Sequence, residues 1–137
     1  MRLGATLYVK NSIEAVETYK KAFGLDLGSD AMTPVTYPDG TYLHAPLFRG
    51  GREIFDVSEE TRNDKLLELL RSSDQRPISS IGINLASEQE VRKAFEILAK
   101  DGRIIGPLKS EPWCACCGEV VDKYGVNWFV CLMEDSI

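Results

Sequence analysis

An internal repeat constrains the fold of this 137-residue chain more than any other feature of the sequence. Residues 4–24, GATLYVKNSIEAVETYKKAFG, and residues 80–102, SIGINLASEQEVRKAFEILAKDG, share one pattern. Each begins with alternating apolar and polar residues, the period of a strand with one buried face, and continues with apolar residues at helical spacing. Each copy therefore predicts a strand followed by a helix.

Both predicted helices carry start and stop signals. A residue that favours the N-cap is followed three positions later by glutamate, which is the spacing of a capping box. A glycine then stands where a left-handed residue ends a helix. The signals are Asn11 with Glu14 and Gly24 in the first copy, and Ser87 with Glu90 and Gly102 in the second.

Strand patterns follow each helix. Residues 37–58, YPDGTYLHAPLFRGGREIFDVS, contain turn signals at 38–40 and at Gly50-Gly51, which predict a meander of three short strands. The second copy has the same pattern, with strands expected at 103–108, at about 114–121 and at 126–133, and a turn at 122–125. The fold class predicted is α+β, with tandem βαβββ modules that form a curved mixed sheet.

We expect a single domain over residues 1–137, because a module of about 60 residues buries little surface alone. The repeats are expected at about 1–58 and 78–135. A helical linker at about 59–77 joins them, with a short helix near 65–71 that ends before Pro77. Pairing of the modules within one chain and exchange between two chains both fit this pattern.

Composition excludes several classes of function. The net charge is −5 and no basic patch is visible, so nucleic acid is not an expected partner. The apolar runs are far shorter than a membrane span, and no secretory signal is recognisable. A cytoplasmic protein is expected, with its four cysteines reduced.

Three stretches resemble the vicinal-oxygen-chelate (VOC) superfamily, which includes glyoxalase I, bleomycin-resistance proteins and extradiol dioxygenases, and most closely its PhnB-like branch. They are EAVETYKKAFG at 14–24, LHAPLFRGG at 43–51, and Trp113 followed by GEVVDKYGVNW at 118–128. The segment from Asp122 to Trp128 is the most specific to this branch. The resemblance implies a fold of two βαβββ modules, and relatives are usually homodimers.

The resemblance also implies where a metal would bind. The superfamily takes one ligand from the first strand and one from the last strand of each half. These positions correspond to Gly4, Ser80 and Phe129, and to Phe55 or, with a one-residue register shift, Asp56. Divalent transition ions prefer imidazole, thiolate and carboxylate, so this set offers at most one useful ligand. We therefore expect no metal and no other cofactor, and no metal-dependent activity of the VOC type.

Nine residues are candidate ligand contacts. Some should line the concave face by strand alternation, His44 is the only histidine, and Cys114 and Cys116 should share one face. Structural roles compete with these assignments: a histidine satisfied by the backbone, buried inert thiols, or a place in a dimer contact. The candidates are Tyr8, His44, Asp56, Asn84, Trp113, Cys114, Cys116, Asn127 and Phe129.

The sequence thus predicts a homodimeric PhnB-like protein that binds a small molecule in a cavity without a catalytic metal. The alternative is a lyase, isomerase or dioxygenase relative with an atypical centre built from Asp56, His44 or the thiols. A third reading is a structural dimer whose cavity is filled by side chains such as Phe55 and Phe129. The identity of the ligand does not follow from the sequence.

Overall fold

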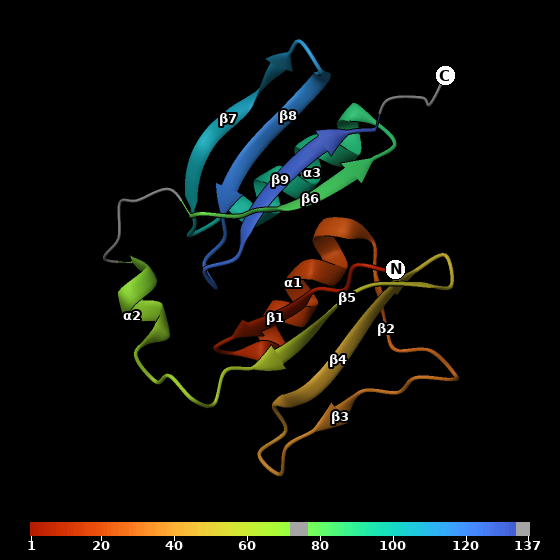
Figure 1. Cartoon of the computed structure of the whole chain (residues 1–137), viewed down its shortest axis with the longest axis vertical. Coiled ribbons are helices and arrows are strands. Elements are labelled where there is room, and N and C mark those ends of the chain that lie inside the picture. Colours follow the sequence, from red (N-terminus) through yellow and green to blue (C-terminus); the bar gives the residue numbers. More distant parts are fainter. Residues whose placement is uncertain (72–76, 134–137) are drawn as a thin grey trace. The chain divides into compact units, whose positions relative to one another are not determined.

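The computed structural model describes residues 1–71 and 77–133. The chain divides into two compact units, Met1–Leu70 and Arg71–Ile137, which are described in turn (Figure 1). Linker residues 72–76 and the predicted end of the second repeat at 134–135 lie outside the described residues. The single-domain organisation stays a prediction.

Unit 1 contains the first βαβββ module and a further short helix. Its sheet has the strand order β1-β5-β4-β2, with β3 paired to β4; β1 runs parallel to β5, and β4 is antiparallel to its neighbours. The predicted meander is confirmed. The elements are β1 (Thr6–Val9), α1 (Ser12–Phe23), β2 (Asp26–Leu27), β3 (Val35–Thr36), β4 (Tyr42–Arg49), β5 (Arg52–Glu59) and α2 (Leu66–Arg71).

Helix α1 covers one face of this sheet, and aromatic rings fix the contact. Tyr19, which is fully buried, meets the ring of Phe55 edge to face at 5.7 Å between centroids. Phe23 meets the same ring at 6.3 Å. Since side chains alternate along a strand, Phe55 and Val57 face the helix and Asp56 lies on the opposite, open face.

The start of α1 differs from the predicted capping box. Asn11 is left-handed (φ 63°) and makes no capping bond to the backbone; its side chain donates to Glu14 instead. The first amides of the helix are satisfied by Glu59 of β5, whose carboxylate accepts from the N–H of Asn11 at 3.1 Å and of Ser12 at 2.8 Å. A negative charge suits a helix N-terminus, so a strand residue distant in sequence performs the capping.

Unit 2 repeats the module. Its sheet has the order β6-β9-β8-β7, with β6 parallel to β9 and the other pairs antiparallel. Here the predicted cap is confirmed, because Ser87 Oγ accepts from the N–H of Glu90. The elements are β6 (Ile81–Leu85), α3 (Glu88–Ala99), β7 (Arg103–Glu111), β8 (Cys114–Val121) and β9 (Asn127–Leu132).

The two helix ends are built differently. Gly24 is left-handed, as predicted (φ 64°). In unit 2 the left-handed residue is Asp101 (φ 58°), one position before the expected Gly102. Gly102 is needed for another reason: a Cβ there would clash with the carbonyl oxygen of Val121. The glycine therefore allows the chain to pass close to the end of β8.

The turn between β8 and β9 is organised by one buried carboxylate. Asp122 accepts hydrogen bonds from the N–H of Tyr124 at 2.9 Å and of Val126 at 3.0 Å. Its other oxygen accepts from the indole N–H of Trp128 at 2.8 Å. Trp128 is fully buried, as predicted. The segment most specific to the PhnB-like branch is thus a structural unit.

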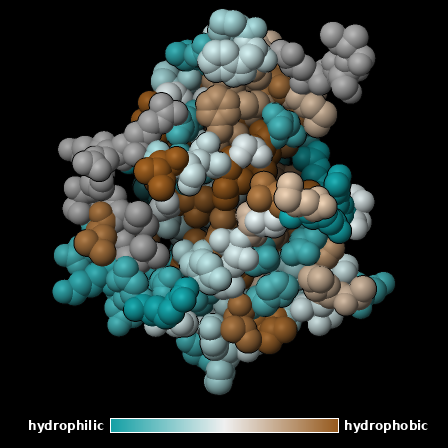
Figure 2. Space-filling model, viewed as in Figure 1, coloured by the Kyte–Doolittle hydropathy of each residue, from teal (hydrophilic) through white to brown (hydrophobic). Residues whose placement is uncertain are grey.

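Exposed apolar residues are spread over several elements. They include Val35 of β3 and Leu69 of α2, and Figure 2 shows brown patches over both segments. Exposed apolar residues of this kind are common on protein surfaces and define no site by themselves. Among residues 1–71 and 77–133, no helix combines the length and apolar composition that a membrane span requires.

Candidate functional site

A cleft of about 320 Å³ lies in unit 2 and is formed by β7, β8 and β9. A Cβ at Gly118 would contact Phe95 of α3, so Gly118 faces the helix and its neighbours Cys117 and Glu119 lie on the open face. The cleft is lined by Ile105, Gly106, Pro107, Lys109, Glu111, Trp113, Cys117, Gly118, Glu119 and Phe129. Two of these, Trp113 and Phe129, are predicted contact residues.

Aromatic rings form part of the cleft wall. Trp113 lies in the turn that joins β7 to β8, and it is 64% exposed. Phe129 lies opposite Glu119 in the pairing of β8 with β9. A cleft lined by an exposed indole and a half-buried phenyl ring offers apolar surface on which a bound molecule loses contact with water.

Polar groups surround these rings. Lys109 and Glu111 form an ion pair at 2.9 Å, and the hydrogen bond that the Lys109 ammonium donates to the Glu111 carboxylate raises the pKa of Lys109. The carboxylate of Glu119 is buried and accepts from Asn127 Nδ2 at 2.9 Å. Asn127 also donates to the carbonyl of Ser79, so this predicted contact residue is engaged within unit 2.

The cysteines have partly different neighbours. Cys116 interacts with Arg92 and Glu88 of α3, whereas Cys114 interacts with Cys117 and Cys131. Cys114 Sγ also donates to the carbonyl oxygen of Cys116. Cys117 and Cys131 are register partners on β8 and β9. Neither Cys114 nor Cys116 is among the residues that line the cleft of unit 2, and their role as ligand contacts stays a prediction. The pairing near Glu111 and Cys114 is irregular, which interrupts the strand alternation at this point.

Burial keeps these thiols protonated. It raises the pKa of Cys116 and of Cys117, and it raises the pKa of Cys131 to about 12, with a further contribution from Cys114 and Cys117. The thiolate is the nucleophilic form, so a raised pKa lowers reactivity at neutral pH.

We expect slow alkylation of the native thiols. At pH 8 a thiol with a pKa of about 12, such as that of Cys131, is a thiolate in about one molecule in ten thousand. Treatment of the folded protein with iodoacetamide at this pH should leave Cys116, Cys117 and Cys131 unmodified long after free cysteine has reacted. Mass spectrometry of peptides gives the extent at each position, and denatured protein provides the control. Rapid native labelling at Cys131 would contradict the assignment.

The open face of unit 1 brings three titratable side chains together. His44 Nε2 lies 4.0 Å from Asp56 Oδ2, and Glu53 offers a third ligand atom within 4.8 Å of both. His44 and Asp56 are predicted contact residues, whereas Glu53 is not. In a regular strand Glu53 would lie on the same face as Phe55, toward the helix, so the sequence pattern did not indicate Glu53 as a residue of the open face.

The ligand positions of the VOC superfamily do not form a metal centre in this chain. Phe55 points to α1, which leaves Asp56 as the residue of β5 on the open face. The predicted first-strand positions, Gly4 and Ser80, lie before β1 and β6; the register partner of Asp56 on β1 is Thr6 instead, and that of Phe129 on β6 is Gly82. One carboxylate with a hydroxyl, a glycine and a phenyl ring do not provide the nitrogen and oxygen donors that such an ion needs.

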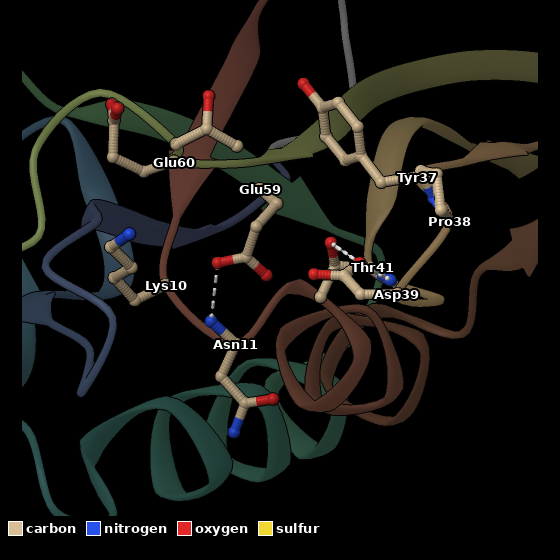
Figure 3. A pocket seen from close by; sticks show the side chains of 9 residues that line it. Lys10, Asn11, Tyr37, Pro38, Asp39, Thr41, Glu59 and Glu60 are labelled. Atoms are coloured by element: carbon tan, nitrogen blue, oxygen red, sulfur yellow. Dashed lines mark hydrogen bonds between the residues drawn. The ribbon is translucent and has the colours of Figure 1, made fainter.

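A second cleft, of about 570 Å³, opens beside the N-terminus of α1 (Figure 3). Its acidic side chains serve the fold. Glu59 caps α1, and Asp39 accepts from the hydroxyl and the N–H of Thr41, which lower the pKa of Asp39. Because Glu59 and Asp39 are engaged in these hydrogen bonds, this cleft offers fewer polar groups for binding a ligand than its size suggests.

The remaining predicted contacts lie elsewhere. Tyr8 is half exposed on β1, with the guanidinium of Arg62 at 5.3 Å from its ring centroid. Asn84 is exposed on β6. The structure therefore places His44 near Asp56 in unit 1, and both Trp113 and Phe129 in the lining of one cleft of unit 2, whereas Tyr8 and Asn84 belong to neither set.

Comparison with solved structures places this architecture in a known class. A PhnB protein from Bacillus cereus matches 97% of this chain and all of its own length, with 26% identity and a TM-score of 0.72. A protein from Pseudomonas aeruginosa is 25% identical over 98% of this chain and all of its own, with a TM-score of 0.67. A glyoxalase/bleomycin resistance protein/dioxygenase family enzyme from Burkholderia phytofirmans shares the fold, at 12% identity, over 92% of this chain and 93% of its own, with a TM-score of 0.60.

The chain has the fold of the VOC superfamily, and the predicted α+β class with tandem βαβββ modules is confirmed. The likeness to the Bacillus protein also confirms the resemblance to the PhnB-like branch. Neither a protein-family model nor a curated protein sequence matches the chain. The homodimer and the cytoplasmic location stay predictions.

Proposed function

We propose that this PhnB-like protein binds a small, mainly apolar molecule with an aromatic ring in the cleft of unit 2. The observation that carries the proposal is a cleft of about 320 Å³ whose lining includes the exposed indole of Trp113 and the ring of Phe129. Small-molecule sites are typically clefts of about 300–1,000 Å³ with aromatic walls and a few polar groups. Lys109, Glu111 and Glu119 supply the polar groups that orient a ligand.

Binding in this cleft requires no bound metal. Its side chains include one thiol that burial keeps protonated, and its acids are engaged with Lys109 and Asn127. The energy of binding would come from covering the two rings, which favours sequestration or sensing of a ligand over chemical conversion. The third interpretation, a structural dimer whose cavity is filled by side chains such as Phe129, is less favoured because Phe129 lines an open cleft.

A panel of one-ring and two-ring aromatic compounds, screened by ligand-observed NMR against the full chain, tests this proposal. We expect hits whose affinity falls about tenfold, or 1.4 kcal/mol, in Trp113→Ala and in Phe129→Ala. Tyr8→Ala is the matched control, since it removes an exposed aromatic ring of unit 1. Hits that survive both cleft substitutions, or that are lost in Tyr8→Ala, would overturn the cleft as the site.

A further inference from the structure

We propose that His44, Glu53 and Asp56 bind a divalent transition-metal ion on the open face of unit 1. The three ligand atoms lie within 4.8 Å of one another, and His44 Nε2 is 4.0 Å from Asp56 Oδ2. Two ligands at about 2.1 Å from a common ion are separated by about 3 to 4.2 Å, depending on the angle between them. Small rotations of the two carboxylates bring all three donors to that separation.

A β-bulge is what brings Glu53 to this face. In the pairing of β4 with β5, Leu47 lies opposite Phe55 and Phe48 lies opposite Glu53. One step along β4 thus corresponds to two steps along β5, and Ile54 is the extra residue. The bulge shifts the alternation of β5 by one position, so that Glu53 and Asp56 lie on the same side of the sheet. Bulges are frequent where a strand must redirect a side chain toward a site.

The donor set selects the kind of ion. One imidazole and two carboxylates suit Mn²⁺, Fe²⁺, Co²⁺ or Zn²⁺ better than a soft ion such as Cu⁺, which prefers thiolate. Three protein ligands leave positions for water or for an exogenous ligand. The side chains of His44 and Asp56 are 39% and 16% exposed, so an ion has access from solvent.

This site differs from the metal centre that the superfamily implies. It uses β4 and β5 alone, takes no donor from β1, and shares only Asp56 with the implied positions. It would replace the prediction of a metal-free protein, which rests on those positions. It is also independent of the proposed ligand cleft, since no residue of that cleft contributes to it.

The single histidine allows a direct test with Mn²⁺ as the probe. The full chain without an affinity tag is titrated with Mn²⁺ in a calorimeter, and the imidazole signals of His44 are followed by NMR. Mn²⁺ has little affinity for thiols, so the four cysteines do not compete. We expect one ion per chain and selective broadening of the His44 signals well below equimolar Mn²⁺.

Substitutions locate the ion. His44→Gln, Glu53→Gln and Asp56→Asn should each weaken Mn²⁺ binding by about 10- to 100-fold, a range already reached by substitutions of outer-shell partners. Asp30→Asn and Glu96→Gln remove exposed carboxylates elsewhere and should leave it unchanged. Circular dichroism checks that each variant is folded. If a variant is not folded, the broadening of the His44 signals in the unaltered chain decides whether Mn²⁺ binds at this site.

Two results would overturn the site: absence of saturable binding up to about 1 mM Mn²⁺, or binding that is undiminished in Glu53→Gln and Asp56→Asn. Trp113→Ala serves as a further control, because a substitution that weakens the binding of aromatic compounds should leave Mn²⁺ binding unaffected. The failure of one proposal is thus distinguishable from the failure of the other.

Discussion

Asp122→Ala is expected to lower the free energy of unfolding by about 4 kcal/mol, since each buried donor that loses its partner costs about 1–3 kcal/mol. The substitution leaves the N–H groups of Tyr124 and Val126 and the indole N–H of Trp128 without their acceptor. Asp122 is 4% exposed and Trp128 is fully buried, so water does not replace the lost bonds without structural change. Equilibrium unfolding in urea measures the effect.

A double-mutant cycle separates the indole bond from the rest of the turn. Trp128→Phe removes the donor and keeps a large aromatic side chain, and the cycle with Asp122→Ala should show a coupling energy of about 1–2 kcal/mol. Asp122→Asn provides the conservative comparison, because it keeps one acceptor oxygen for the turn. Additivity within about 0.5 kcal/mol would show that the indole bond contributes nothing to stability.

This result bears on how family-specific residues are interpreted. The segment from Asp122 to Trp128 is the part of the sequence that most resembles the PhnB-like branch, and its position at the last strand invites a functional reading. In the structure its acid, its glycine turn and its indole hold one hairpin together. Specificity of a motif for a family therefore does not by itself indicate a site.

The sequence predicted the elements of both modules because the signals are local. Alternation over residues 4–9 and 80–85, helical spacing after them, and the turn at Gly50-Gly51 depend on near neighbours in the chain. Ser87 capped its helix as predicted for the same reason. Asn11 did not, because Glu59, 48 residues away, supplies the acceptor that a local rule assigned to Asn11.

The candidate sites were less accessible to sequence reasoning, because register decides them. A bulge in β5 brings Glu53 near Asp56, and irregular pairing of β7 with β8 interrupts the alternation near Cys114. Strict alternation assigns these residues to the wrong faces, since one extra residue reverses every side chain beyond it. Trp113 stays a candidate contact that lines the cleft of unit 2, and its position after Pro112 at the start of a strand lies outside the alternating region.

Tyr19→Ala should lower the free energy of unfolding by about 3–5 kcal/mol, the usual cost of truncating a large buried ring. Tyr19 is fully buried between α1 and the sheet, and its loss also removes the edge-to-face contact with Phe55. Phe95 occupies the corresponding stripe of α3, and Phe95→Ala should have a similar cost. Urea titrations followed by circular dichroism measure both.

The comparison of the two substitutions tests the repeat itself. If the two modules are stabilised in the same way, the aromatic residue that packs each helix against its sheet should contribute similarly to the free energy of unfolding. Tyr8→Ala is the control for an aromatic ring outside the core and should cost less than about 1 kcal/mol, because surface substitutions rarely exceed this. A loss below about 1 kcal/mol for both Tyr19→Ala and Phe95→Ala would contradict the packing of α1 and α3. A loss at one position alone would show that the two modules do not depend on their helices in the same way.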